Sequence, residues 1–313
     1  MQKNDSYVPP MPEILAQLSE LHGKLPYKLT NDYLFRAVFQ TNKKVLKELL
    51  AAVLHLDSAE IRELDILNPI LLGEAMNEKT CILDLFLLMN DHTRINIEMQ
   101  VASTDYYMDR VLLYACRAYD NLERGENYQE LKPVIHISLL ADTPRTGEKK
   151  FYSENRVRDI RDGKIFSRNL GIIIVQLKEN ENADMPEIES GLDKWARLFL
   201  AETWEELQEM IKESEWMAET VYTLRNLTED EKIRLECEAR DRYEHDRASL
   251  YGSGVREGMR RGMEEGMKQG EKQGRLAEQA NTERERQRAE AAEAELDRLK
   301  ALLREKGISS ESV

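Results

Sequence analysis

All eight prolines of this 313-residue chain lie at or before Pro186, so the last 127 residues contain none. Proline inside a helix costs about 3 kcal/mol, and a proline-free stretch rich in alanine, glutamate and arginine therefore predicts continuous helices. Before that point the chain alternates between helix-like and strand-like patterns. We predict four parts in order: a leader at 1–27, an α/β domain at 28–180, a helical region at 181–250 and a glycine-periodic, charged helical tail at 251–313.

The spacing of apolar residues predicts the elements of the second and third parts. Apolar side chains at helical intervals follow a capping Thr30 or Asn31, which predicts a helix as far as about Leu54. The order of the predicted elements is typical of an α/β fold with a mixed sheet. They are strands at 61–66, 80–89, 94–101, 133–140 and 171–177, a helix at 105–123, a hairpin at 152–167, and helices at 191–214, 215–226 and 228–250.

The tail carries a glycine at every fourth residue from Gly254 to Gly274. Six glycines cost several kcal/mol of helix propensity in aggregate, so a helix here is expected to be marginal unless it is paired. Leucines near the end, from Leu296 to Leu303, form its only apolar seam. We interpret the tail as a tether or a self-association arm, with a second copy of the chain as its simplest partner.

Composition excludes several classes of protein. No apolar run approaches the ~18 residues of a spanning helix, which excludes a membrane protein. The N-terminus has no apolar segment of the secretory type, so we expect no signal peptide. Cys81, Cys116 and Cys237 are odd in number and far apart, which indicates neither a disulfide framework nor a zinc site. A cytoplasmic protein is the expectation.

The net charge of −14 argues at first against nucleic acid as a partner, but the charge is unevenly distributed. Residues 1–180 carry 26 acids and 23 bases, whereas residues 181–313 carry 33 acids and 22 bases. The segment from Arg145 to Arg168 holds eight bases against four acids, a local excess of the kind that phosphate contact requires. The alternative is an ordinary solvated hairpin. Lys149, Lys150 and Arg156 are its candidate DNA contacts.

Charged side chains within two otherwise apolar strands form the candidate catalytic group. Asp84 is the sole charge in TCILDLFLLM, and Glu98 and Gln100 share one face of RINIEMQV by the period-two rule. A short turn joins the two segments, so neighbouring antiparallel strands would bring Asp84 beside Glu98. Two such carboxylates repel unless a cation neutralises them, and oxygen ligands suit Mg²⁺. The alternative is a half-exposed strand in which Asp84 is an edge charge that blocks aggregation.

An acid, a turn and then Glu-x-Gln on the next strand resembles the PD-(D/E)XK nuclease superfamily, with Gln in place of the last Lys. LTNDYLFRAVF, ILDLFLLMNDHTRINIEMQ, YYMDRVLLYACRAYDNLERGENYQELKPVIHISLL and the glycine-punctuated tail together resemble its Rpn family of recombination-promoting nucleases and transposases. The resemblance covers roughly residues 28–180 and the style of the tail. It implies a restriction-endonuclease-like αβββαβ core and metal-dependent DNA cleavage linked to recombination or transposition.

The resemblance also implies roles for individual residues. Asp84 and Glu98 would be the catalytic and metal-binding acids, and Asp32 would complete the shell around Mg²⁺ or, in its place, Mn²⁺. Gln100 would stand where the catalytic lysine usually lies. A neutral amide can orient a water but cannot stabilise developing negative charge as lysine does, which puts the rate in question.

The helix at 105–123 carries a stripe of tyrosine and arginine that includes Arg110, Tyr114 and Arg117. These side chains could contact DNA phosphates. Alternatively, the tyrosines pack against the sheet while Arg110 pairs with Asp84 or Glu98.

We therefore expect a Mg²⁺-dependent deoxyribonuclease that acts on DNA and associates with itself through its C-terminal helices. The rival interpretation is a catalytically weak DNA-binding or assembly protein in which the helical arm is the working part.

Overall fold

The computed structural model describes residues 8–71, 81–101, 106–120, 122, 125–142 and 149–305. The chain divides into two compact units, the first ending at Tyr243 and the second beginning at Glu244. No helix in these described ranges combines the length and apolar character needed to cross a membrane.

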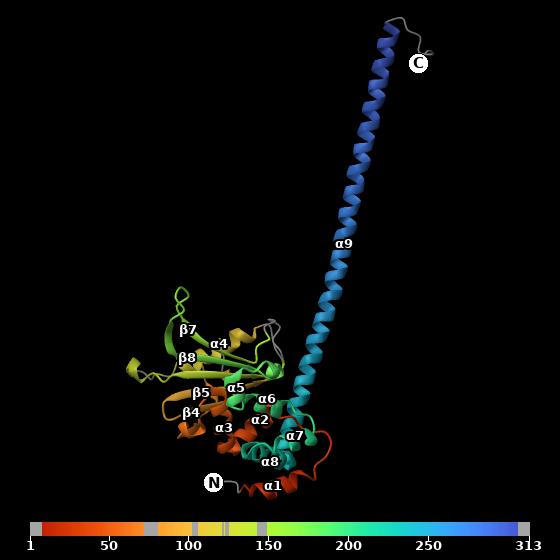
Figure 1. Ribbon diagram of the computed structural model, residues 1–313. Coiled ribbons are helices and arrows are strands. Elements are labelled where there is room, and N and C mark those ends of the chain that lie inside the picture. The colour runs from red at the N-terminus through yellow and green to blue at the C-terminus, as the bar shows by residue number, and fades with distance from the viewer. Residues whose placement is uncertain are drawn as a thin grey trace. The chain divides into compact units, whose positions relative to one another are not determined.

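The first unit is built on a mixed six-stranded sheet (Figure 1). Its strand order is β1-β4-β5-β6-β8-β7, in which the pairs β5/β6 and β6/β8 are parallel and the others antiparallel. The six strands are β1 (Leu64–Ile66), β4 (Leu85–Met89), β5 (Thr93–Gln100), β6 (Val134–Leu140), β8 (Ile165–Gln176) and β7 (Tyr152–Arg158). A separate two-stranded ladder pairs β2 (Ile70–Leu71) with β3 (Cys81–Ile82). The predicted α/β class with a mixed sheet is confirmed.

Helices cover both faces of the sheet (Figure 1). The main core lies on one face, where alternate side chains of β5 such as Ile95 and Ile97 pack with α2 (Asp32–Thr41), α3 (Lys43–Leu54) and α6 (Leu192–Leu200). The opposite face is covered by α4 (Tyr107–Tyr119) through smaller apolar clusters. The polar positions of β5 therefore project toward α4.

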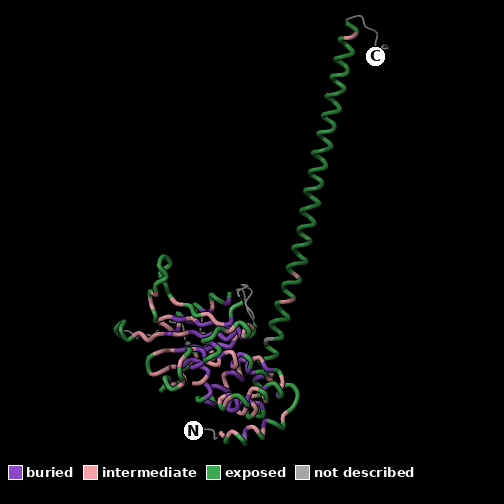
Figure 2. The backbone as a smooth tube through the Cα atoms, in the orientation of Figure 1, coloured by how far each residue is buried: buried purple, intermediate pink, exposed green. Residues whose placement is uncertain are grey.

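The remaining helices surround the main core or continue into the tail. α1 inserts Ile14 and Leu18 into this core, and Figure 2 shows buried residues concentrated in the first unit. These helices are α1 (Met11–Leu18), α5 (Met185–Glu189), α7 (Trp204–Met210), α8 (Glu215–Glu229) and α9 (Glu231–Glu305), with short 3₁₀ turns at Ser58–Glu60, Tyr128–Glu130 and Leu177–Asn182.

Several predicted element boundaries are wrong, and each has a local cause. The single helix expected as far as Leu54 is broken at Asn42, whose extended backbone lets its side-chain oxygen accept from Val45 N at 3.1 Å and cap α3. The helix predicted at 191–214 is likewise divided, because Thr203 caps a new helix, α7. The strand expected at 171–177 is the end of a longer strand, β8, which also forms the second arm of the predicted hairpin. The helices expected at 228–250 and beyond are one continuous helix, α9.

Candidate active site

Asp84 lies where β4 separates from β5. The antiparallel register pairs Leu85 with Ile97, so Asp84 stands opposite Glu98 in the continuation of the ladder. The chain bends at this residue, and the Asp84 Oδ2 atom accepts a hydrogen bond from the main-chain N–H of Met99 at 3.0 Å. The carboxylate thus takes the place of a ladder carbonyl and is held at the end of the strand pair.

Glu98 is buried in the middle of the sheet on the face toward α4. It is 7% exposed, and its Oε1 atom accepts from Asn96 Nδ2 at 3.3 Å. Burial, together with the nearby charge of Asp84, raises its pKa to about 7. Burial likewise raises the pKa of Asp84 to about 6. The two predicted carboxylates are therefore neighbours whose charged forms are disfavoured by burial, and a bound cation would offset that cost.

Asp32 occupies the first turn of α2, which Asn31 caps by accepting from Leu34 N at 3.2 Å. The charge of Asp32 contributes to the raised pKa of Asp84, which places the two acids within electrostatic range. Asp32 Oδ2 forms an ion pair with Arg240, while its Oδ1 atom is buried with no hydrogen-bond partner among the described residues. A buried carboxylate oxygen without a donor is an unusual feature that a bound cation would satisfy.

Gln100 and Arg110 lie together beside Glu98. The Arg110 guanidinium donates from Nη2 to Gln100 Oε1, and its positive charge acts to lower the pKa of Glu98. The Arg110 Nε atom is buried without an acceptor among the described residues. The structure thus brings a full positive charge next to the amide that stands at the expected lysine position.

A line of buried polar groups extends from Glu98 across the sheet, and the sequence interpretation missed it. Asn96 Nδ2 contacts His136 Nδ1 at 2.9 Å, and His136 Nε2 contacts Ser138 Oγ at 3.0 Å. The parallel register places Asn96 beside His136 and Glu98 beside Ser138. Burial lowers the pKa of His136 to about 3, so the ring is neutral. The period-two alternation of PVIHISLL was the available signal, since it puts His136 and Ser138 on one face.

The tyrosine and arginine stripe of α4 faces the sheet. Tyr107 is 3% exposed, and Tyr114 packs against an apolar cluster that includes Phe86 and Val134. These two tyrosine rings therefore pack against the sheet, as the alternative interpretation of the stripe expects. Arg117 lies on the same helix and is half-buried.

The basic segment divides into two environments. Lys149 and Lys150 are exposed, whereas Arg145 lies outside the described residues. Arg156 donates from Nε to Glu154 Oε1 at 2.7 Å and from Nη1 to the Arg168 carbonyl oxygen at 3.2 Å. Its guanidinium also lies over Gly171, where a Cβ atom would collide with it. Arg156 therefore braces the β7–β8 hairpin.

The donor set fits a hard divalent cation. In the described ranges, no three His, Cys, Asp or Glu side chains are gathered closely enough to form a ready-made metal cage. Mg²⁺ does not require one, because it keeps several waters and is usually bound by one or two carboxylates together with substrate phosphates. Asp84 and Glu98 supply such a pair, and the unpartnered oxygen of Asp32 lies within electrostatic range of it.

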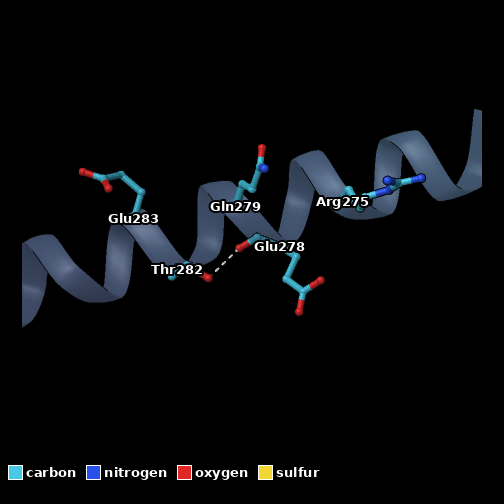
Figure 3. Close-up of a pocket in the computed structure, with 5 residues that line it drawn as sticks. All are labelled: Arg275, Glu278, Gln279, Thr282 and Glu283. Atoms are coloured by element: carbon cyan, nitrogen blue, oxygen red, sulfur yellow. Dashed lines mark hydrogen bonds between the residues drawn. The ribbon is translucent and has the colours of Figure 1, made fainter.

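A shallow groove on α9 is not a comparable site. It is lined by five side chains of one helix, all of them exposed, and its internal hydrogen bond joins Thr282 Oγ1 to the Glu278 carbonyl oxygen at 2.9 Å (Figure 3). A single helix surface of this kind encloses no ligand.

The chain was compared with known protein families, with curated proteins and with solved structures. Residues 29–253 match the model of a family described as PD-(D/E)XK nuclease family transposase. This range contains Asp32, Asp84, Glu98 and Gln100, as well as the whole six-stranded sheet. No curated protein and no solved structure matches the chain.

Proposed function

We propose that this chain, which belongs to the PD-(D/E)XK nuclease family of transposases, hydrolyses phosphodiester bonds in DNA with the aid of a divalent metal ion. Nucleases of this superfamily generally use divalent metals. The observation that carries the proposal is the pair formed by Asp84 and Glu98. These two acids stand opposite each other in the continuation of the β4–β5 ladder. Burial raises the pKa of both, and the charge of Asp84 adds to the rise at Glu98.

We assign Asp84, Glu98 and Asp32 as the residues that would hold Mg²⁺, or Mn²⁺ in its place. A divalent ion bound there would supply Lewis-acid polarisation of the phosphodiester and a more acidic water. Asp84 is fixed by the Met99 N–H, and Glu98 is fixed by Asn96. Both carboxylates are therefore pre-positioned by the sheet and need little rearrangement to act as ligands.

Gln100 and Arg110 would act together on the reacting groups. The Gln100 amide can orient a water by hydrogen bonding but carries no charge. The guanidinium bound to its side-chain oxygen supplies the positive charge that lysine provides in the usual motif, and its buried Nε–H has no acceptor among the described residues. Arg110 would thus stabilise negative charge that develops on the phosphate.

DNA would be held by exposed cations outside the acid cluster. Lys149 and Lys150 precede the β7–β8 hairpin and are exposed, as phosphate contacts must be. Arg117 on α4 is a further candidate contact. Arg156 and Tyr114 would contribute indirectly, since Arg156 braces the hairpin and Tyr114 packs α4 against the sheet.

The test is cleavage of supercoiled plasmid by the full chain with Mg²⁺ and with EDTA. Asp84→Asn and Glu98→Gln should each reduce the rate at least a hundredfold, because each removes a ligand charge while preserving shape. Asp91→Asn is the matched control, since Asp91 lies in the turn of the same hairpin and should leave the rate unchanged. Wild-type rates in both acid variants would show that the assigned site is wrong.

The rival function is DNA binding or assembly without efficient catalysis. Ion pairs that tied up both acids of the pair would favour it. Within the described ranges neither Asp84 nor Glu98 has an ion-pair partner within 4 Å, whereas Asp32 has one in Arg240. In the described part of the chain, the lack of a close ion pair at either acid favours the nuclease.

A further inference from the structure

The first three turns of α9, residues 231–243, pack against the segment that leads into α2; we call this part the α9 root. The Tyr27 hydroxyl donates to Glu238 Oε1 at 3.2 Å, and Asn31 Nδ2 donates to Asp241 Oδ1 at 2.8 Å. Cys237, the residue before Glu238, is fully buried in the main core. The α9 root is therefore anchored in the first unit beside the N-terminus of α2.

This packing brings Arg240 onto Asp32. The guanidinium forms an ion pair with Asp32 Oδ2, while the neighbouring Asn31 is held by the next residue of the same helix, Asp241. Asp32 is only 9% exposed, and its Oδ1 atom has no donor in the described part of the chain. One oxygen of the carboxylate is thus fixed by a cation and the other is left as an unpaired buried acceptor.

We propose that Arg240 is a positioning residue of the active site, which holds Asp32 so that Oδ1 is available to the metal shared with Asp84. The inference rests on the proposed function and extends it, because it makes the α9 root a part of the nuclease site. The helix that begins the C-terminal arm then has two roles, one in the arm and one in ordering the third acid.

Whether loss of Arg240 weakens or strengthens metal binding depends on how exposed the Arg240 and Asp32 side chains are. The Arg240 side chain is 45% exposed, so water screens its repulsion of a divalent ion, whereas Asp32 is buried and depends on its partner for orientation. Loss of a hydrogen-bonded partner behind a metal ligand typically weakens metal binding by about 10- to 100-fold. Removal of Arg240 should therefore weaken metal binding.

The test is calorimetric titration of Mn²⁺ into the full chain without DNA. Arg240→Gln should weaken Mn²⁺ binding by at least about tenfold. Arg240→Lys, which keeps the charge, should restore part of the loss. Arg242→Gln is the matched control, because Arg242 lies on the same helix, is exposed and donates to the Glu238 carbonyl oxygen of its own helix at 3.2 Å; it should bind Mn²⁺ as the wild type does.

The thermal midpoint in EDTA separates positioning from folding. Arg240→Gln with an unchanged midpoint and weaker Mn²⁺ binding supports the inference. If that variant does not fold, Arg240→Lys decides in its place, with weaker binding at an unchanged midpoint as the supporting result. Equal or tighter Mn²⁺ binding in the folded variant overturns the inference.

Asp84→Asn distinguishes this failure from failure of the proposed function. If Asp84→Asn loses Mn²⁺ binding and Arg240→Gln does not, only the role of Arg240 is overturned. If the wild type binds no Mn²⁺, or Asp84→Asn binds it normally, the metal site itself is wrong and both proposals fall.

Discussion

The acid pair is a source of instability in the metal-free protein. Burying an ionised carboxylate without a neighbouring cation costs free energy, so folded proteins rarely place two such acids together in their interior. The pKa of Asp84 rises from 3.8 to about 6 and that of Glu98 from 4.5 to about 7. A site that binds a divalent ion can keep such groups, since the bound ion offsets their repulsion.

The first residue-scale prediction is that Asp84→Asn and Glu98→Gln stabilise the metal-free protein. Between about pH 4 and pH 7 the folded chain retains protons that the unfolded chain has released, so the free energy of unfolding falls as pH rises. The penalty is complete above pH 7, and the neutral variants lack it. In EDTA at pH 8 each variant should gain about 1 to 3 kcal/mol, seen as a higher thermal midpoint.

The comparison is made against the wild type at pH 4 and pH 8. The lowered pKa of His136 destabilises the fold as pH falls below 6.5, but it is common to all three proteins and cancels in the difference. Arg36, Arg240 and Asp32 around Asp84 and Arg110 beside Glu98 are also unchanged by these substitutions. A stabilisation of equal size at both pH values would show that the acids do not titrate as described.

At the scale of elements, strand periodicity and the short turn predicted the central part of the site. The alternation of polar and apolar residues in RINIEMQV predicted on which face of the sheet Glu98 lies. The short turn after Met89 predicted that the strand carrying Asp84 is its antiparallel neighbour. These features depend on residues close together in the chain, and such local patterns can be predicted from the sequence. The helix breaks at Asn42 and Thr203 were not predicted. At each position the side chain can cap a new helix or remain inside a continuous one, and the local sequence does not distinguish the two.

Contacts between distant segments were not predictable in the same way. No periodicity connects Asp32 with Arg240, which meet only because the α9 root lies beside the N-terminus of α2. The same is true of Arg156, whose guanidinium is placed by a glycine on the paired strand. Sequence reasoning therefore pointed to the proposed acids and to Arg110 beside Glu98, but not to Arg240 at Asp32.

The element-scale prediction concerns the residues that lead into the β7–β8 hairpin. Lys149→Gln with Lys150→Gln should weaken DNA binding and reduce the slope of log affinity against log salt by up to about 2, since each lost phosphate contact removes about one unit. The control carries the same charge change at Lys194 in α6 and at Lys212 in the turn after α7, and it should keep the wild-type slope. If both double variants behave alike, the effect is one of net charge and these lysines are not contacts.

At the scale of the whole molecule, α9 raises the question of what stabilises a helix of 75 residues. Figure 2 shows that it is exposed along the second unit. Among the described residues, a side chain placed at any of its periodic glycines from Gly254 to Gly274 would meet open space beyond the helix itself, and Leu296, Leu299 and Leu302 are 44 to 51% exposed. Surface ion pairs such as Arg260 with Glu264 contribute little because water screens them, whereas each glycine costs about 1 kcal/mol relative to alanine.

We therefore predict that the arm pairs with the arm of a second copy, and that cutting both strands of DNA requires the pair. Truncation after Tyr251 retains the α9 root with Arg240 and removes the glycine and leucine stripes. Light scattering should show a dimer for the full chain and a folded monomer for the truncated one, because a helix with that glycine content is marginal without a partner.

The monomer offers one acid cluster to a duplex, so it should nick supercoiled plasmid while linearising it at least tenfold more slowly than the full chain. Truncation after Glu305 removes only the last eight residues and should remain dimeric. A chain ending at Tyr251 that stays dimeric and still linearises plasmid at the full rate would remove any role for the arm in cleavage.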